Sequence, residues 1–228
     1  MTSLLERTIS IIAPHSCIRC SKESNVLCDS CRFELFAEGP ELCFLCNNPT
    51  ADSRVCRPCR ASTKLGHVWT AATYEGDVKR LIRAYKFERV RAAYQPLAAA
   101  IIDRLPYLEG IVVAYIPTAS RRVRQRGYDH ARLLAQEVAR LQGWECQPLL
   151  LRRHDARQVG ATKQQRKQQA QLAFELKSNV MLEGRHILLI DDVTTSGATL
   201  VAAADILSSA GAIRVDAAVV AKHTLEQP

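Results

Sequence analysis

The sequence has no apolar run close to the roughly 20 residues that a membrane-spanning helix needs. The segment from Met1 to Ser16 is interrupted by Glu6 and Arg7 and lacks the apolar core of a secretion signal, so we expect a cytoplasmic protein without membrane insertion. No internal repeat or low-complexity tract is present, and a content of 47% hydrophobic residues excludes the disordered and fibrous classes. A globular chain remains, with one large domain or one domain and a small appendage.

Two signatures of nucleotide and nucleic-acid binding are absent or weak. The chain has no Gly-Lys-Ser/Thr sequence, which excludes a Walker nucleotide-binding loop. Aromatic residues make up only 6% of the chain, and few of them fall among its basic residues. A base-stacking platform is therefore only weakly indicated.

Basic residues, by contrast, are abundant and clustered. The windows 79–91, 121–132 and 152–167 hold 17 of the 31 Lys and Arg residues and only three acids, for a net charge of +14. Because the whole chain carries +8, the remainder carries −6. Such clustering favours a polyanionic ligand, and it suits both pyrophosphate groups and nucleic acid.

Eight of the nine cysteines form four Cys-x-x-Cys pairs near the amino end: Cys17 and Cys20, Cys28 and Cys31, Cys43 and Cys46, Cys56 and Cys59. Without a secretion signal, these pairs indicate zinc ligands rather than disulfides, with redox-active or free thiols as the alternative. The simplest pairing joins neighbouring pairs into two zinc sites, although an interleaved pairing is also compatible with the spacing. Four thiolates leave no open coordination position, so both sites are predicted to be structural.

From about Gly66 onward, short apolar segments alternate with amphipathic ones. Strands are expected over 69–74, 111–116, 187–190 and 214–220, and helices over 78–87, 92–105, 130–141 and 198–209. This alternation predicts an α/β fold with a parallel-rich sheet. We therefore expect a cysteine module over residues 1–64 and an α/β domain over residues 65–228.

The most informative segment is His186 to Leu200, where two carboxylates follow the apolar run. Asp191 and Asp192 stand at the end of the expected strand, where open α/β sheets place their ligands. The turn that follows is rich in hydroxyl groups and leads into a helix, so its N–H groups can cradle a phosphate. Its residues are Thr194, Thr195, Ser196, Gly197, Ala198 and Thr199.

Two acids followed by a threonine-rich loop resemble the phosphoribosyl pyrophosphate signature of type I phosphoribosyltransferases. The rest of the chain resembles the ComF family of predicted amidophosphoribosyltransferases linked to DNA uptake. That resemblance covers nearly the full length and rests on Tyr74-Glu75-Gly76, Lys86-Phe87, Arg126-Gly127-Tyr128-Asp129, and Gln158 with Arg166.

The resemblance implies the type I phosphoribosyltransferase fold, a parallel-rich sheet flanked by helices, preceded by a small four-cysteine zinc-ribbon module. It implies that Asp191 and Asp192 are catalytic, that the segment 117–122 is a pyrophosphate loop with Ser120 and Arg121 as its closest contacts, and that Mg²⁺ accompanies the substrate. Lid and cleft residues would be Lys86, Arg126, Gln158 and Arg166. The chain departs from the family pattern at three positions, His130, Gln169 and Leu172, which bears on the choice of acceptor.

Three functions follow from these observations. The first is a phosphoribosyltransferase whose acceptor the sequence does not reveal, linked to DNA uptake or nucleotide metabolism. The second is a non-catalytic competence adaptor that binds single-stranded DNA on the basic windows and a helicase partner through the cysteine module. The third is a nucleotide-sensing regulator on the same fold.

Overall fold

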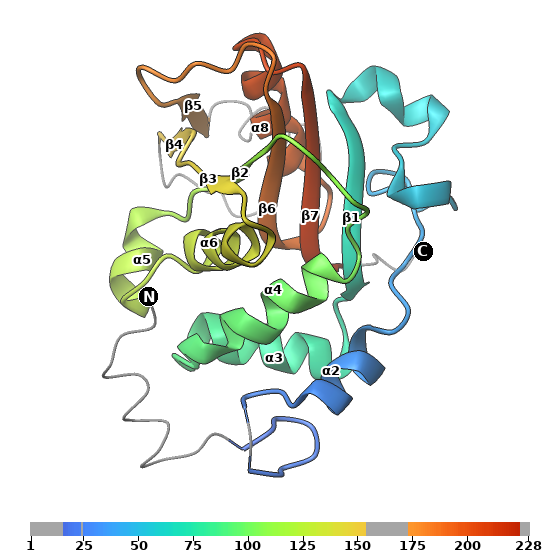
Figure 1. Cartoon of the computed structure of the whole chain (residues 1–228), viewed down its shortest axis with the longest axis vertical. Coiled ribbons are helices and arrows are strands. Elements are labelled where there is room, and N and C mark those ends of the chain that lie inside the picture. The colour runs from blue at the N-terminus through green and yellow to red at the C-terminus, as the bar shows by residue number, and fades with distance from the viewer. Residues whose placement is uncertain (1–15, 24, 154–172, 224–228) are drawn as a thin grey trace, which may run out of the picture.

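The computed structural model describes residues 16–23, 25–153 and 173–223, and a five-stranded parallel sheet lies at its centre (Figure 1). The strand order is β1-β7-β6-β2-β3, and every neighbouring pair is parallel. Two further strands, β4 and β5, form a small antiparallel pair. The strands are β1 (Leu65–Thr73), β2 (Ile111–Tyr115), β3 (Glu145–Cys146), β4 (Leu150–Arg152), β5 (Phe174–Leu176), β6 (His186–Thr194) and β7 (Arg214–Lys222).

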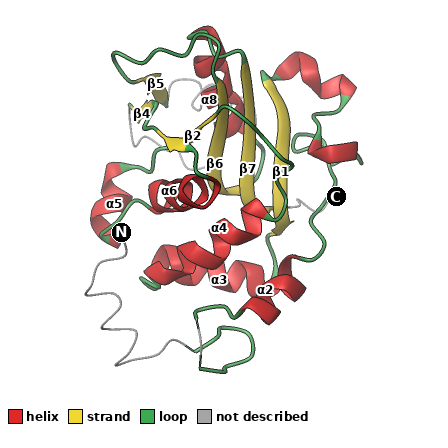
Figure 2. Ribbon diagram, viewed as in Figure 1, coloured by secondary structure: helices red, strands yellow, loops and turns green. Residues whose placement is uncertain are grey.

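Helices cover both faces of the sheet, as the apolar character of its central strands requires (Figure 2). Three helices that follow β1 and β2, together with one from the cysteine segment, lie on one face, and α8 lies on the other (Figure 1). Within the described ranges, no helix has the length and apolar character of a membrane span. The helices are α2 (Asp29–Phe36), α3 (Gly76–Phe87), α4 (Tyr94–Ile102), α5 (Ser120–Arg126), α6 (His130–Gln142) and α8 (Ala198–Ser209), with 3₁₀ turns at Ala51–Ser53, Arg57–Ser62 and Arg91–Ala93.

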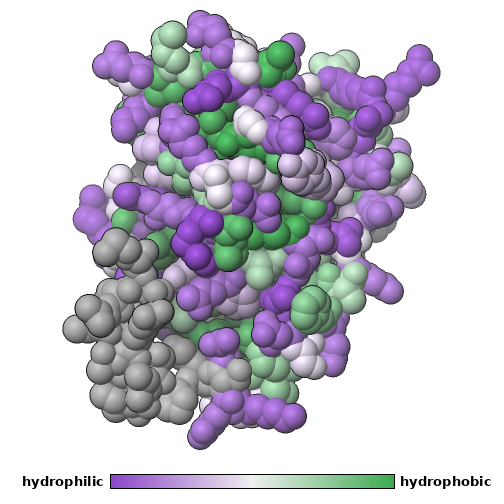
Figure 3. Space-filling model, in the orientation of Figure 1, coloured by the Kyte–Doolittle hydropathy of each residue, from purple (hydrophilic) through white to green (hydrophobic). Residues whose placement is uncertain are grey.

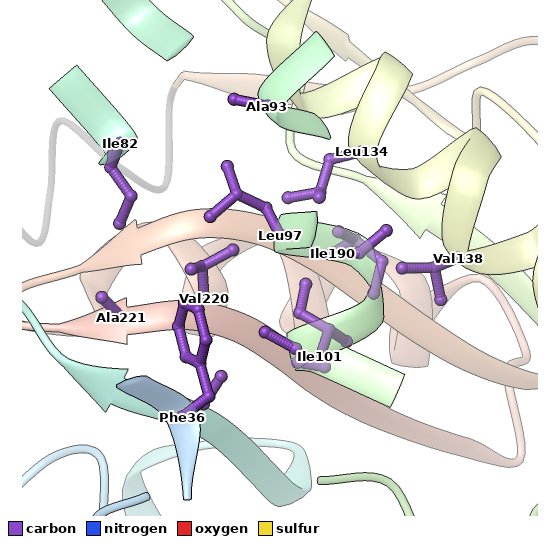
Figure 4. Packing of buried hydrophobic residues seen from close by; sticks show 14 of the residues in the cluster. Phe36, Ile82, Ala93, Leu97, Ile101, Leu134, Val138, Ile190, Val220 and Ala221 are labelled. Atoms are coloured by element: carbon purple, nitrogen blue, oxygen red, sulfur yellow. The ribbon is translucent and has the colours of Figure 1, made fainter. Parts of the chain in front are cut away.

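The alternation of side chains along the strands divides the core into two clusters. In β6, Leu188 and Ile190 belong to the cluster under α3, α4 and α6, whereas Ile187 and Leu189 belong to the cluster under α8. Figure 4 shows the first cluster, with Leu97 of α4 among side chains from α2, α3, α6, β6 and β7. The outer face of this layer is largely hydrophilic, with scattered apolar patches (Figure 3).

The cysteine segment packs against both faces of the sheet. Cys17, Cys31 and Phe36 are buried in the cluster under α3, α4 and α6, and Cys43 and Phe44 are buried in the cluster under α8. An isolated antiparallel bridge between Arg54 and His67 also ties this segment to β1. The division into residues 1–64 and 65–228 stays a prediction, and β1 begins at Leu65.

The expected helices and strands agree with the structure to within a few residues, with two differences that concern the site: β6 extends through Asp191 and Asp192, and part of the segment 117–122 is helical. The segment 117–122 was expected to be a loop, but Ser120 and Arg121 form the first turn of α5. The helix ends at Gly127, whose left-handed backbone (φ 84°) allows its N–H to bond the Val123 carbonyl. Residues 116–119 form the loop between β2 and α5.

Candidate functional site at the carboxyl end of β6

Asp191 and Asp192 lie inside β6 rather than after it. The strand β6 continues to Thr194 because its neighbour β7 continues to Lys222. Thr194 and Lys222 are paired in the parallel ladder. Successive side chains of a strand point to opposite faces, so the two carboxylates diverge. Asp192 is 3% exposed, and Asp191 is half-buried.

The Asp192 carboxylate is held between a lysine and a histidine from two different helices. Lys86 Nζ of α3 lies 2.8 Å from Oδ1, and His130 Nε2 of α6 lies 2.7 Å from Oδ2. Burial alone would raise the pKa of Asp192, but the charge of Lys86 and the proximity of His130 hold it far below its usual range. The His130 contact is close but not aligned as a full hydrogen bond, so Oδ2 keeps capacity for a donor from a ligand.

Asp191 has the opposite electrostatic environment. Burial and the negative charge of Asp192 raise its pKa, and the Lys86 charge and the Asp192 N–H, which donates to Asp191 Oδ1 over 2.8 Å, only partly oppose that shift. The pair thus combines one carboxylate that is firmly ionised with one whose ionisation is costly until a cation or donor arrives.

His130 connects this carboxylate to the predicted cleft residues. Its Nδ1 lies 2.7 Å from a terminal nitrogen of Arg126 and 3.3 Å from the Thr118 hydroxyl. The hydroxyl of the buried Tyr85 donates to the His130 carbonyl over 2.7 Å. Lys86, Arg126 and Asp192 are thereby brought together beside one buried imidazole.

The turn after β6 leads directly into the N-terminus of α8. Gly197 adopts φ 72° as the N-cap of the 12-residue helix α8, and Thr195 is exposed beside it. The first amides of α8 have no partners inside the helix, and the helix dipole adds positive potential at the same place. A turn of this kind at the start of a helix can bind an anion such as phosphate.

The segment after β2 runs alongside this site. Ile116 N–H donates to the Ile190 carbonyl over 3.1 Å, so the Pro117 loop begins beside Asp191. Thr118 joins the His130 group by donating to Asp129 Oδ1 over 2.7 Å. Ser120 and Arg121 follow on the exposed first turn of α5. Two other predicted residues, Gln158 and Arg166, lie outside the described residues.

The eight cysteines of the four pairs form two groups, Cys17, Cys20, Cys28 and Cys31, and Cys43, Cys46, Cys56 and Cys59. In each group, the four Sγ atoms lie within 4.8 Å of one another, which confirms the pairing of neighbours. The Cys20–Cys28 and Cys46–Cys56 sulfur distances are 3.8 and 3.5 Å, and tetrahedral zinc with sulfurs at about 2.3 Å places them roughly 3.8 Å apart. Both groups therefore fit zinc.

Backbone N–H groups favour the thiolate form of one cysteine in each group. Burial opposes ionisation of Cys17 and Cys43, but N–H groups of neighbouring residues point at each sulfur and lower the pKa of each thiol to about 6. In the first group, hydrogen bonding to Cys28 raises the pKa of Cys31 to about 12. Four sulfurs packed this closely cannot all ionise without a bound cation.

Residues 96–227 match the family model for the phosphoribosyl transferase domain. The chain belongs to this family. The match includes β6, α8 and β7, and hence the two carboxylates and the turn that follows them. Lys86 and both cysteine groups lie before it.

Curated relatives extend the similarity of this phosphoribosyltransferase-family chain toward the amino end. It is 29% identical over 200 residues to "Competence protein ComFC" of Bacillus subtilis, covering 83% of this chain and 81% of that protein. It is 27% identical over 219 residues to "DNA utilization protein YhgH" of Escherichia coli, covering 83% and 93%. These relatives confirm the resemblance to the ComF family.

Two solved structures are similar to part of the chain. The allosteric regulatory enzyme of purine biosynthesis aligns with a TM-score of 0.41 at 19% identity, covering 57% of this chain and 26% of that one. Adenine phosphoribosyltransferase from Thermoanaerobacter pseudethanolicus aligns with a TM-score of 0.38 at 16% identity, covering 57% and 80%.

Several residues around the site of this family member were not predicted from the sequence. His130 was noted only as a departure from the family pattern, and Thr118 was not assigned a role of its own. Phe44 and Lys222 were also missed. For Lys222 a signal exists, because a lysine at the end of an apolar strand is buried only if its ammonium group has a hydrogen-bond partner. The remaining contacts arise from packing between helices that are distant in sequence.

Proposed function

We propose that this chain binds phosphoribosyl pyrophosphate with Mg²⁺ and transfers the phosphoribosyl group to an acceptor. One observation carries the proposal. The two neighbouring carboxylates of β6 are followed directly by a hydroxyl-rich turn at the start of α8. One of them, Asp192, forms an ion pair with Lys86. A sugar phosphate needs two recognition elements. Carboxylates accept hydrogen bonds from its ribose hydroxyls, and the N–H groups of a helix N-terminus donate to its 5′-phosphate.

In the proposed complex, Asp191 and Asp192 accept hydrogen bonds from the ribose hydroxyls, and residues 194–199 bind the 5′-phosphate. Ser120 and Arg121 contact the pyrophosphate from α5, with Lys86 and Arg126 adding positive charge to the cleft. Gln158 and Arg166 belong to the proposed lid. A lid matters because closure excludes water from a glycosyl cation that hydrolyses readily.

The reaction is a displacement at C1 of the ribose. The acceptor lone pair forms a bond to C1 while the bond from C1 to the pyrophosphate oxygen breaks, and that electron pair leaves with pyrophosphate. Positive charge develops on the ring in the transition state, where the negative field of Asp191 and Asp192 stabilises it. Bound Mg²⁺, for which aspartate oxygens are suitable ligands, would neutralise charge on the leaving group.

The proposed function is tested by calorimetric titration of phosphoribosyl pyrophosphate with Mg²⁺. Asp192→Asn should lose most of the affinity while keeping the zinc content of the wild type. Since Asp192 is buried, a second variant, Thr195→Glu, places a negative charge at the exposed turn, where repulsion should exclude the phosphate. Ser209→Glu, an equivalent change at the exposed far end of α8, is the matched control and should bind as the wild type does. Equal affinity for all four proteins would contradict the site.

A second candidate function, binding of single-stranded DNA, is supported by the basic windows and by the names of the relatives. Lys79, Arg80 and Arg83 are exposed on α3 and line a surface depression. Changing these three to alanine should weaken DNA binding and make its salt dependence shallower, because fewer counterions are released. Turnover of phosphoribosyl pyrophosphate should instead depend on Mg²⁺ and on Asp192. An adaptor without catalysis would bind DNA in a salt-dependent way but would not turn over phosphoribosyl pyrophosphate. In that case, the cysteine module is the surface on which to test binding of a helicase partner.

A further inference from the structure

The turn proposed to bind phosphate packs against the second cysteine group. A Cβ atom added at Gly197 would lie 2.6 Å from Phe44 Cε2 and 3.2 Å from a Leu45 methyl carbon. Phe44 is 2% exposed, and Gly197 is buried beneath it. The aromatic ring therefore occupies the space that any side chain at position 197 would need, and it closes the back of the turn.

A buried lysine holds the same segment from the adjoining strand. Lys222 Nζ donates to the Cys43 carbonyl over 2.7 Å, and Lys222 is 2% exposed. Lys222 is also the ladder partner of Thr194, and the next N–H, that of His223, donates to the Thr194 carbonyl over 2.9 Å. The start of the turn and the backbone before Phe44 are thus fixed to one strand end.

Phe44 lies between two metal ligands, Cys43 and Cys46, in a tight turn of the chain. Cys43 N–H donates to the Asn48 carbonyl over 2.8 Å, and Asn47 N–H donates to the Cys43 carbonyl over 3.0 Å. Between residues 37 and 50 the segment has no helix or strand, only an isolated antiparallel bridge between Leu42 and Pro49. Coordination of the four sulfurs supplies a constraint on the ring, because metal binding orders small cysteine modules.

The first cysteine group lies on the other side of the sheet. Cys17 and Cys31 pack with Phe36 in the cluster under α3 and α4, and Cys43 and Phe44 pack with Leu200 of α8 in the opposite cluster. Both groups have the same ligand set, but the side chains nearest to Gly197, those of Phe44 and Leu45, belong to the segment of the second group. The two groups therefore differ in their relation to the turn.

We propose that Phe44 is a positioning residue for the phosphate-binding turn, and that metal bound by Cys43, Cys46, Cys56 and Cys59 holds it there. This inference rests on the proposed function for the role of the turn, but the mechanical coupling stands on the contacts alone. The first cysteine group stabilises the opposite face and leaves the turn unaffected. Two sites with the same four-cysteine ligand set thus have different roles, one in positioning the turn and one in stabilising the opposite face of the sheet.

The experiment compares Phe44→Ala with Phe36→Ala. Both remove a buried phenyl ring next to a cysteine group, so general destabilisation is matched. Amide hydrogen exchange over residues 194–200 reports how often the turn opens. In Phe44→Ala, exchange there should rise by about tenfold or more while the exchange of α4 amides stays at the wild-type rate. In Phe36→Ala, the turn should exchange as in the wild type. Phe44→Leu, which refills most of the space, should restore slow exchange.

A second pair of variants tests the metal. Cys59→Ser and Cys28→Ser should each lower the bound zinc from two ions to one, as measured by mass spectrometry under native conditions. Only Cys59→Ser should raise exchange over 194–200. Unchanged exchange in Phe44→Ala, or an equal rise in Phe44→Ala and Phe36→Ala, would overturn the inference, even if the cysteine variants fail to fold.

Ligand affinity separates this inference from the proposed function. If the wild-type protein binds phosphoribosyl pyrophosphate, Phe44→Ala should weaken binding by about tenfold while Phe36→Ala keeps it. If the wild-type protein does not bind it, the proposed function fails, and the exchange measurements still decide whether the second cysteine group controls the turn.

Discussion

Lys86 Nζ lies 2.8 Å from Asp192 Oδ1, and this ion pair joins α3 to the end of β6. The side chains are 17% and 4% exposed, so solvent screens the pair only weakly. Lys86→Met would leave the carboxylate without its cation, and removing one partner of a buried pair costs about 3–5 kcal/mol. We expect that loss in the free energy of unfolding by urea at neutral pH. Lys86→Arg, which keeps the charge, should recover part of it, and a Lys86→Met protein as stable as the wild type would contradict the pair's importance.

His130 is expected to present a ring N–H to Asp192. The guanidinium of Arg126 can only donate, so Nδ1 of His130, 2.7 Å from it, accepts, and the ring proton is on Nε2 facing Asp192. A glutamine amide can present the same acceptor and donor, but leucine presents neither. His130→Gln should therefore keep the affinity for phosphoribosyl pyrophosphate within about threefold, and His130→Leu should weaken it by about tenfold or more. Calorimetry checks both, and an equal loss in the two variants would mean that ring shape matters rather than hydrogen bonding.

Asp191 is predicted to destabilise the ligand-free fold at neutral pH. Its pKa is raised in the folded state, mainly by burial and then by Asp192, so folding is penalised once the pH exceeds the unfolded value of about 4. The penalty grows as the pH rises toward the folded pKa. Asp191→Asn removes the charge, and each kcal/mol gained should raise Tm by about 2–4 °C for a chain of this size.

Thermal unfolding across a pH series checks this prediction for Asp191. The gain in Tm of Asp191→Asn should be larger at about pH 8 than at about pH 5.5, because the wild-type carboxyl is more ionised at the higher pH. A gain that is the same at both values would show that the effect comes from packing rather than from charge.

The sequence predicted the elements that local residues determine. The expected helix 198–209 coincides with α8 because Gly197 adopts the left-handed backbone that begins it. The zinc groups follow from the four Cys-x-x-Cys pairs, whose close spacing lets neighbouring pairs meet. The helix α5 was missed, although Pro117 before it and Gly127 after it are ordinary signals of a helix start and stop.

What the sequence could not predict depends on contacts across long separations. Phe44 and Gly197 are more than 150 positions apart, and their contact depends on how the cysteine segment folds over the sheet. The place of His130 between Arg126 and Asp192 depends on how α6 lies on β6. No periodicity or spacing encodes such pairs, because they follow from the packing of completed elements.

Zinc content distinguishes the eight paired cysteines from the ninth. We expect two zinc ions per chain, and a change of Cys56 to Ser should leave one, because three thiolates bind zinc far more weakly than four. Cys146 lies in β3, where burial raises the pKa of its thiol to about 11. A thiol that stays protonated is a poor metal ligand. Cys146→Ser should therefore keep both ions, and a loss of zinc in that variant would mean that the ninth cysteine takes part in coordination.

A second buried carboxylate, far along the sheet from the ligand site, is predicted to be purely structural. Asp216 of β7 is fully buried, and it accepts the His67 N–H over 2.8 Å. His186 Nε2 and Arg214 Nε each lie 2.7 Å from its other oxygen. Burial alone would raise the pKa of Asp216, but these partners lower it below its usual value. The ionised form is thus the one that the fold stabilises.

Because the folded pKa of Asp216 is lowered, its contribution is present above the unfolded value of about 4 and is lost only as the pH falls through the folded value. Asp216→Asn should therefore cost about 3 kcal/mol or more in urea unfolding, by the same amount at about pH 7 and about pH 5. Asp52→Asn, a change at an exposed aspartate, is the control and should cost little. A cost that differs between the two pH values would contradict this assignment, because a carboxylate with a lowered pKa stays ionised throughout that interval.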